Sequence, residues 1–218
     1  MSLPELQEKL LAWATAEPRR SWLLESRAAY FGRYGEPHEE DKSFESRMNG
    51  MLDAYLYDFR PEGGEERTIE RFIGSQGALL SPEGLAAYRD LARNVHAVFE
   101  VRRMQPGEIR LREIFGGGDY DVSERRQLVG LEKGDLIEAR LLPFEGKLVF
   151  SGSFIYHPQG ARKRVLAEVK RLKKVAAKEG KPVDVPAFLA LLSRMAFKLE
   201  RYRNVKLESI YDFESPIR

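Results

Sequence analysis

The chain has 218 residues, of which 43% are hydrophobic and 32% are charged, and its formal net charge is +2. These values are typical of a globular protein with one large domain or two small ones, which can bury a core without a metal or a disulfide. Because there is no cysteine, disulfides, thiolate zinc sites, iron–sulfur clusters and cysteine nucleophiles are excluded.

No basic segment followed by an apolar core opens the chain, and no apolar run approaches the roughly 18 residues of a membrane span. We therefore expect neither a signal peptide nor a transmembrane helix. The lack of cysteine also fits a reducing compartment. Together these features predict a cytoplasmic protein that has no membrane partner.

Charge is separated along the sequence. Residues 157–206 contain 14 Lys and Arg against 4 Asp and Glu, whereas residues 1–94 contain 12 against 17. Residues 95–156 are nearly balanced, with 9 against 10, and residues 207–218 contain 1 against 3. A basic C-terminal element on an acidic body indicates either an anionic partner or a docking surface inside the protein.

Residues 1–94 have the apolar spacing of amphipathic helices, with patterns that begin at Pro4, Trp22, Thr68 and Ser81. Ser81 followed by Pro82 is a strong helix start, since serine caps and proline fits the first turn. The clearest helix places one apolar face on Phe44, Met48, Met51, Leu52, Tyr55, Leu56 and Phe59. We expect residues 1–94 to form a helical region.

The apolar period changes from 3.6 to 2 near Val95, which predicts strands. About five short strands follow within residues 95–156, separated by turns at Gly116–Gly118 and between Pro143 and Gly146. Strands this short do not bury two faces as a flat sheet, so a small closed or half-closed β-barrel of OB or SH3 type is expected.

A helical period returns after Pro158, with an apolar stripe on Val165, Val169, Leu172 and Ala176. The segment Gly180–Pro182 breaks this helix, and a second apolar stripe runs from Val185 to Tyr202. Residues 157–206 are therefore predicted to form a basic helical hairpin, followed by a C-terminal tail at 207–218. The expected fold class is α+β.

Several short phrases in the middle of the chain are similar to those of a known family. They are Asp53–Phe59, Thr68–Ile73, Val98–Val101, Leu111–Gly118, Asp121–Arg125 and Gly134–Leu141. Over roughly residues 45–155 they resemble an uncharacterised bacterial module often found in proteins with a C-terminal SEC-C zinc motif. The resemblance implies helices followed by a barrel, and no established activity. The zinc motif itself is absent, since this chain has no cysteine, and the basic hairpin occupies that end.

The first candidate site is the cationic side of the predicted helix after residue 160. It comprises Arg162, Lys163, Arg164, Lys170, Arg171, Lys174 and Lys178. Such a stripe binds a phosphate backbone through counterion release, so nucleic acid or another polyanion is the expected partner. The alternative is a solvated face that neutralises the acidic N-terminal half. Membrane binding is less favoured, because the opposite face is Val, Leu and Ala without Trp or Phe anchors.

A second candidate is a base-stacking face on the barrel. It would combine Phe99, Tyr120, Phe144, Phe150, Phe154 and Tyr156 with Arg102, Arg103, Arg110, Arg112, Arg125 and Arg126. At alternating strand positions, however, we expect these aromatic side chains to form the barrel core instead.

Metal and catalytic motifs are weak. Asp119, Asp121 and Glu124 lack calcium-loop spacing, and the histidines at 38, 96 and 157 lie far apart. Gly116–Gly118 lacks the Gly-Lys-Ser/Thr ending of a phosphate loop. We therefore expect no metal site and no cofactor.

Three function classes follow. The first is a non-enzymatic protein that binds nucleic acid or a ribonucleoprotein through the basic hairpin. The second is an interaction adaptor or oligomeric scaffold, suggested by the apolar stripe Val185–Tyr202 and by a tail, Ile210–Phe213, that could dock on a protein partner. The third, an enzyme, requires a pocket in which distant Asp, Glu and His side chains converge.

Overall fold

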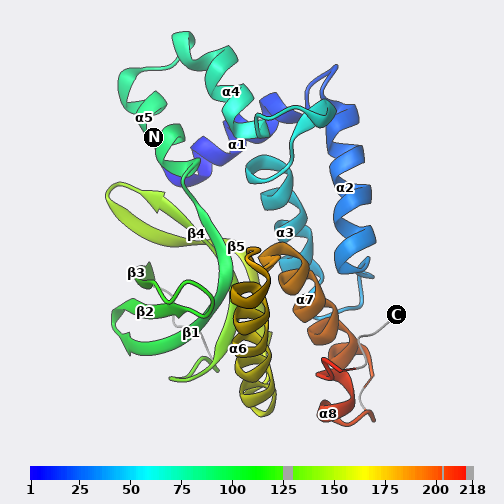
Figure 1. The fold of residues 1–218 in the computed structure, drawn as a ribbon. Coiled ribbons are helices and arrows are strands. Elements are labelled where there is room, and N and C mark those ends of the chain that lie inside the picture. Colours follow the sequence, from blue (N-terminus) through cyan, green and yellow to red (C-terminus); the bar gives the residue numbers. More distant parts are fainter. Residues whose placement is uncertain (125–129, 203, 215–218) are drawn as a thin grey trace.

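The computed structural model describes residues 1–124, 130–202 and 204–214. The predicted N-terminal helical region is confirmed (Figure 1). Its helices are α1 (Leu3–Thr15), α2 (Arg20–Tyr34), α3 (Phe44–Tyr57), α4 (Thr68–Gln76) and α5 (Pro82–Leu91). Ser81 caps α5 by accepting a hydrogen bond from the Gly84 amide, as its sequence predicts. α4 begins at Thr68, where its pattern begins, and Arg67 is its N-cap residue.

The strands form a closed five-stranded barrel. They are β1 (Val95–Gln105), β2 (Gly107–Glu113), β3 (Asp119–Glu124), β4 (Leu136–Phe144) and β5 (Lys147–His157). The strand order is β1-β2-β3-β5-β4, and β4 pairs with β1 to close it. β3 and β5 are parallel through Val122 and Leu148, and the other pairings are antiparallel. This Greek-key order is that of an OB-type barrel.

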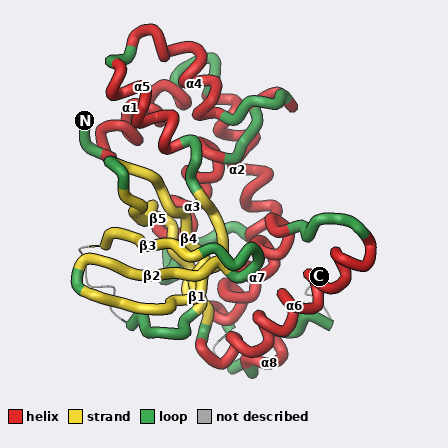
Figure 2. Tube along the Cα trace, turned by 60° about the vertical axis from the view of Figure 1, so that its left-hand side comes forward, coloured by secondary structure: helices red, strands yellow, loops and turns green. Residues whose placement is uncertain are grey.

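The C-terminal part contains α6 (Arg162–Glu179), α7 (Val185–Arg201) and the short α8 (Leu207–Ile210). Gly180 ends α6 with a left-handed φ of 66°, a conformation that glycine adopts without steric cost. Figure 2 shows the strands between the N-terminal helices α1, α4 and α5 on one side and α6 and α8 on the other. The α+β fold class, with helices at both ends of a central barrel, is confirmed.

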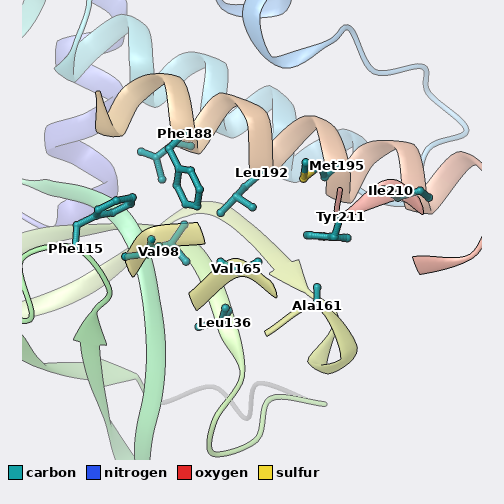
Figure 3. Packing of buried hydrophobic residues seen from close by; sticks show 12 residues of the cluster. Val98, Phe115, Leu136, Ala161, Val165, Phe188, Leu192, Met195, Ile210 and Tyr211 are labelled. Atoms are coloured by element: carbon teal, nitrogen blue, oxygen red, sulfur yellow. The ribbon is translucent and has the colours of Figure 1, made fainter. Parts of the chain in front are cut away.

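Three apolar clusters hold these layers together. The first fills the barrel and includes Phe99, Leu111 and Ile137. The second lies among α1, α3, α4 and α5 and reaches β4 through Leu142. The third joins α6, α7 and α8 to the outer face of the barrel, where Val98 contributes (Figure 3). The barrel is therefore covered from two directions, and both helical regions are parts of one packed body.

The third cluster covers most of the apolar side chains that suggested a docking surface, and Tyr202 at the end of the α7 stripe is exposed. Phe188 and Leu192 of α7 point toward the barrel (Figure 3) and are at most 3% exposed. Ile210 and Tyr211 are fully buried, and Phe213 stacks on Phe188 with ring centroids 6.1 Å apart. The expectation that the tail offers Ile210–Phe213 to a partner is wrong, because the chain's own third cluster already holds these side chains.

Helix α3 lies close against β5, and a glycine permits this approach. A Cβ on Gly50 would lie 2.6 Å from the Tyr30 hydroxyl and 2.8 Å from Ser153 Oγ. On the same helix, Ser46 Oγ donates to the Phe154 carbonyl at 2.6 Å and accepts from the Phe154 amide at 2.8 Å. These contacts fix α2 and α3 on the barrel and position the residues between them.

His157 at the end of β5 is buried, with 3% exposure, and its Nδ1 lies 3.1 Å from the Tyr211 hydroxyl. Burial lowers the pKa of His157 to about 4 from the ordinary 6.5. The histidine therefore has a structural role and is neutral in the folded protein at pH 7.

We predict that His157 makes the protein sensitive to acid. The unfolded chain binds a proton at this imidazole below pH 6.5 and the folded protein does not, so stability falls as the pH drops from 6.5 toward 4. Between pH 7 and pH 5 the loss is about 2 kcal/mol. Denaturant unfolding of wild type and His157→Asn at the two pH values measures it. An equal pH dependence in both proteins would contradict this account.

Candidate functional site

Helix α6 is held to the barrel at defined points. Arg162 donates to Glu100 Oε1 of β1 at 2.5 Å, and Lys173 Nζ donates to the Phe115 carbonyl at 2.7 Å. Val165 and Val169 are buried in the third cluster on the same side of the helix. These contacts fix the rotation of α6 about its axis, so its opposite side must face solvent.

Of the seven predicted site residues, two form internal ion pairs. Arg162 pairs with Glu100, and Arg171 pairs with Glu168 on its own helix at 2.7 Å. Burial would raise the pKa of Glu100, but the hydrogen bonds and charges of Arg162 and Arg102 outweigh burial and lower it. These two arginines therefore contribute mainly to the structure around α6.

The other five residues form one exposed surface, which we call the basic ridge. It consists of Lys163, Arg164, Lys170, Lys174 and Lys178. All five are exposed, and within residues 1–124, 130–202 and 204–214 none has an ion pair. From Lys163 to Lys178 the helix rises about 22 Å. The ridge is thus a line of free cations on a helix that is firmly attached to the barrel.

The barrel does not assemble the stacking face. Phe99 and Phe150 are buried inside it, as expected for alternating aromatic residues, and Tyr120 packs edge-on against Phe99. The arginines of the candidate face pair with neighbouring acids: Arg102 with Glu100, Arg103 with Glu108, and Arg110 with Asp119 and Asp121. Arg112 is exposed, and Arg125 and Arg126 lie outside the described residues.

A second candidate site is a cavity of about 560 Å³ between α2, α3 and the start of α7, which we call the α2–α7 cavity. Its inner wall is made by Arg140 of β4 and His96 of β1, with Asp58 and Asn94 beside them. Arg140 is 2% exposed, and its Nη1 and Nη2 atoms both donate hydrogen bonds to the Asp58 carboxylate. Arg140 also donates to Asn94 Oδ1.

Two further acids lie behind this wall. The Asp53 carboxylate is 3.9 Å from Arg140 Nε, and Glu138 Oε1 is 3.1 Å from His96 Nε2. Burial raises the pKa of the Asp53 carboxyl, against the charge of Arg140. Burial would lower the pKa of Arg140, but the charge of Asp58 and its hydrogen bonds outweigh burial and raise it.

The α2–α7 cavity meets the geometric condition for a site assembled from distant residues. Asp58 and His96 line it, and Glu138 contacts His96 from behind. Sequence reasoning missed it because these residues come from the end of α3, from β1 and from β4. A usable signal was present, since Glu138 and Arg140 are charged residues inside the otherwise apolar segment Leu136–Leu142.

Comparison with known proteins places most of this chain in one family. The model of a family of unknown function (DUF7986) matches residues 26–196. The chain belongs to this family. The match extends beyond the resemblance at 45–155 on both sides, and it includes the barrel, α6 and the residues that line the α2–α7 cavity. No curated protein and no solved structure matches the chain.

Two features are absent from the described residues. None of their helices has the length and apolar content that crossing a bilayer requires. Nor do three or more of their His, Asp or Glu side chains gather in an arrangement suited to a metal ion.

We predict that Arg140→Met lowers the free energy of unfolding by about 3 kcal/mol, because it leaves the buried Asp53 without a counter-charge. Adding Asp53→Asn to this variant should recover part of the loss. Arg89→Met, at an exposed position on α5, is the control and should change stability little. Denaturant unfolding measures all of these variants. A loss no larger than that of Arg89→Met, or a further loss on adding Asp53→Asn, would contradict the role given to Arg140.

Proposed function

We propose that this protein is a non-enzymatic binding protein that engages nucleic acid, free or in a ribonucleoprotein, through the basic ridge. The observation that carries the proposal is the set of five exposed cations without an ion pair among the described residues. In the alternative explanation, these cations neutralise the acidic N-terminal helices. That arrangement would bring the cations into contact with N-terminal carboxylates. No such contact occurs in the described chain.

Geometry favours an extended anion over a compact one. Lys170, Lys174 and Lys178 follow one another at i, i+4 spacing, which places successive side chains about one helical turn apart on one face. A linear phosphate backbone can contact such a row at several points. A membrane surface is a poorer match, because the exposed large apolar residue on α6 is Val175, and aromatic anchors are absent from this helix.

The adaptor alternative has less support from the fold. Phe188, Leu192 and Met195 of the α7 stripe and the tail residues Ile210 and Tyr211 are covered by the chain's own core, whereas Tyr202 at the end of the stripe is exposed. A bacterial, cytoplasmic setting and a kinship with SEC-C proteins stay part of the proposal, supported by the sequence resemblance. Because the family has no known function, its assignment is compatible with nucleic-acid binding and does not favour it over other functions.

We predict binding that depends steeply on salt. If all five ridge cations contact the phosphates of a single strand, the affinity falls roughly 100-fold between 50 and 200 mM salt. Fluorescence polarisation with a labelled 20-nucleotide RNA and a DNA of matching sequence measures this. Salt-independent binding, or no binding at 50 mM salt, would remove the proposal.

The triple variant Lys170→Glu, Lys174→Glu, Lys178→Glu should bind the same RNA at least 30-fold more weakly at 50 mM salt, because three attractive contacts become repulsive. The matched control is Lys9→Glu, Arg20→Glu, Arg89→Glu, which makes the same change in net charge at exposed positions of α1, α2 and α5. The control should lose only the small share that comes from net charge. Equal losses in the two variants would show that α6 is not the binding surface.

A further inference from the structure

We propose that the α2–α7 cavity is a binding site for a small organic anion, a molecule of metabolite size that carries a phosphate or carboxylate group. This is a separate site from the basic ridge, and it requires no nucleic acid. The proposal rests on the volume of the cavity, on the arginines that line it and on the polar groups of its inner wall.

The volume fits a small molecule. About 560 Å³ lies within the range of natural ligand pockets, roughly 300 to 1,000 Å³. The cavity has an apolar side, formed by Val185, Pro186 and Leu189 at the start of α7, and a polar side around Asp58 and Arg140. A wall divided in this way orients a ligand that has both an apolar body and polar groups.

Arginine predominates among the residues that line the cavity, with four arginines against one acid, Asp58. Two of these arginines are matched by acids in the lining or behind it: Arg140 by Asp58 and Asp53, and Arg67 by Glu70 at 2.7 Å. The other two, Arg33 and Arg60, are exposed and have no ion pair within the described residues. The site therefore attracts an anion, and its two free guanidinium groups are suited to a phosphate or carboxylate.

The inner end can hold the rest of the ligand. Asp58 is half-exposed although its partner Arg140 is buried, so its carboxylate can accept from a hydroxyl or amino group of the ligand. His96 lines the same wall with 21% of its side chain exposed. Arg140 Nε and Glu138 Oε2, which are buried without a hydrogen bond among the described residues, belong to the layer behind this wall with Asp53.

The competing explanation is a hydration cavity that holds only water. The two explanations differ in what happens when the cavity is filled. Ala29 of α2 is exposed and lines the cavity, so Ala29→Trp should occupy it without disturbing the core. Ala28 is also exposed and is not a lining residue, which makes Ala28→Trp a matched control on the same helix.

The test is a titration of the ¹⁵N-labelled protein with phenyl phosphate, benzoate and neutral phenol, followed by NMR. We expect at least one anion to shift the amides of Asn94, His96 and residues 187–189 saturably, and phenol to bind at least tenfold more weakly. The anion that binds more tightly identifies the charged group. Ala29→Trp should abolish these shifts, Ala28→Trp should retain them, and Arg33→Ala with Arg60→Ala should weaken binding at least tenfold.

Three results would overturn the proposal: no shift at these amides with either anion, unchanged shifts in Ala29→Trp, or phenol binding as tightly as the anions. The triple glutamate variant of the basic ridge should bind the anions as wild type does. If that variant loses RNA binding and keeps anion binding, the two sites are separate. Each proposal can then fail without affecting the other.

Discussion

The buried guanidinium of Arg140 is the interaction on which the arrangement of helices and barrel depends. It extends from β4 to Asp58 at the end of α3 and to Asn94 just before β1, so one side chain joins the helical region to the seam that closes the barrel. A buried ion pair is costly to desolvate and contributes most through the geometry that it specifies. Here it sets where α3 ends relative to the barrel, and it forms the inner wall of the α2–α7 cavity.

Two arginines contact the same aromatic ring from different depths. Buried Arg47 donates to Ser43 and Ser193 and lies 3.9 Å from the centre of the Phe197 ring, and the exposed Arg201 lies over the same ring at 3.9 Å. A planar guanidinium satisfies several partners at once and is more weakly hydrated than an ammonium, so it tolerates burial. The ridge lysines of α6, by contrast, are exposed to solvent. A chain of nearly neutral net charge can therefore present a strongly basic line on one helix.

The periodicity of apolar residues predicted the structural features that depend on residues close together in the sequence. Three predicted starts correspond to elements of the structure: α3 at Phe44, α5 at Ser81–Pro82 and β1 at Val95. The cations of α6 lie opposite Val165 and Val169, as expected for a helix that turns 100° per residue. Long-range partners could not be predicted in this way. The parallel pairing of β3 with β5, the burial of Tyr211 and the contact of Arg140 with Asp58, 82 residues away, depend on tertiary packing. For that reason the basic ridge was visible in the sequence and the α2–α7 cavity was not.

The central claim is that the ridge lysines are free in the unbound protein and covered in the complex. Amine labelling read by mass spectrometry, with and without saturating RNA, tests it at each lysine. We expect Lys163, Lys170, Lys174 and Lys178 to react quickly alone and to be protected by RNA, while Lys9 and Lys147 are unchanged. Protection that is uniform over the surface, or confined to lysines outside α6, would contradict the account.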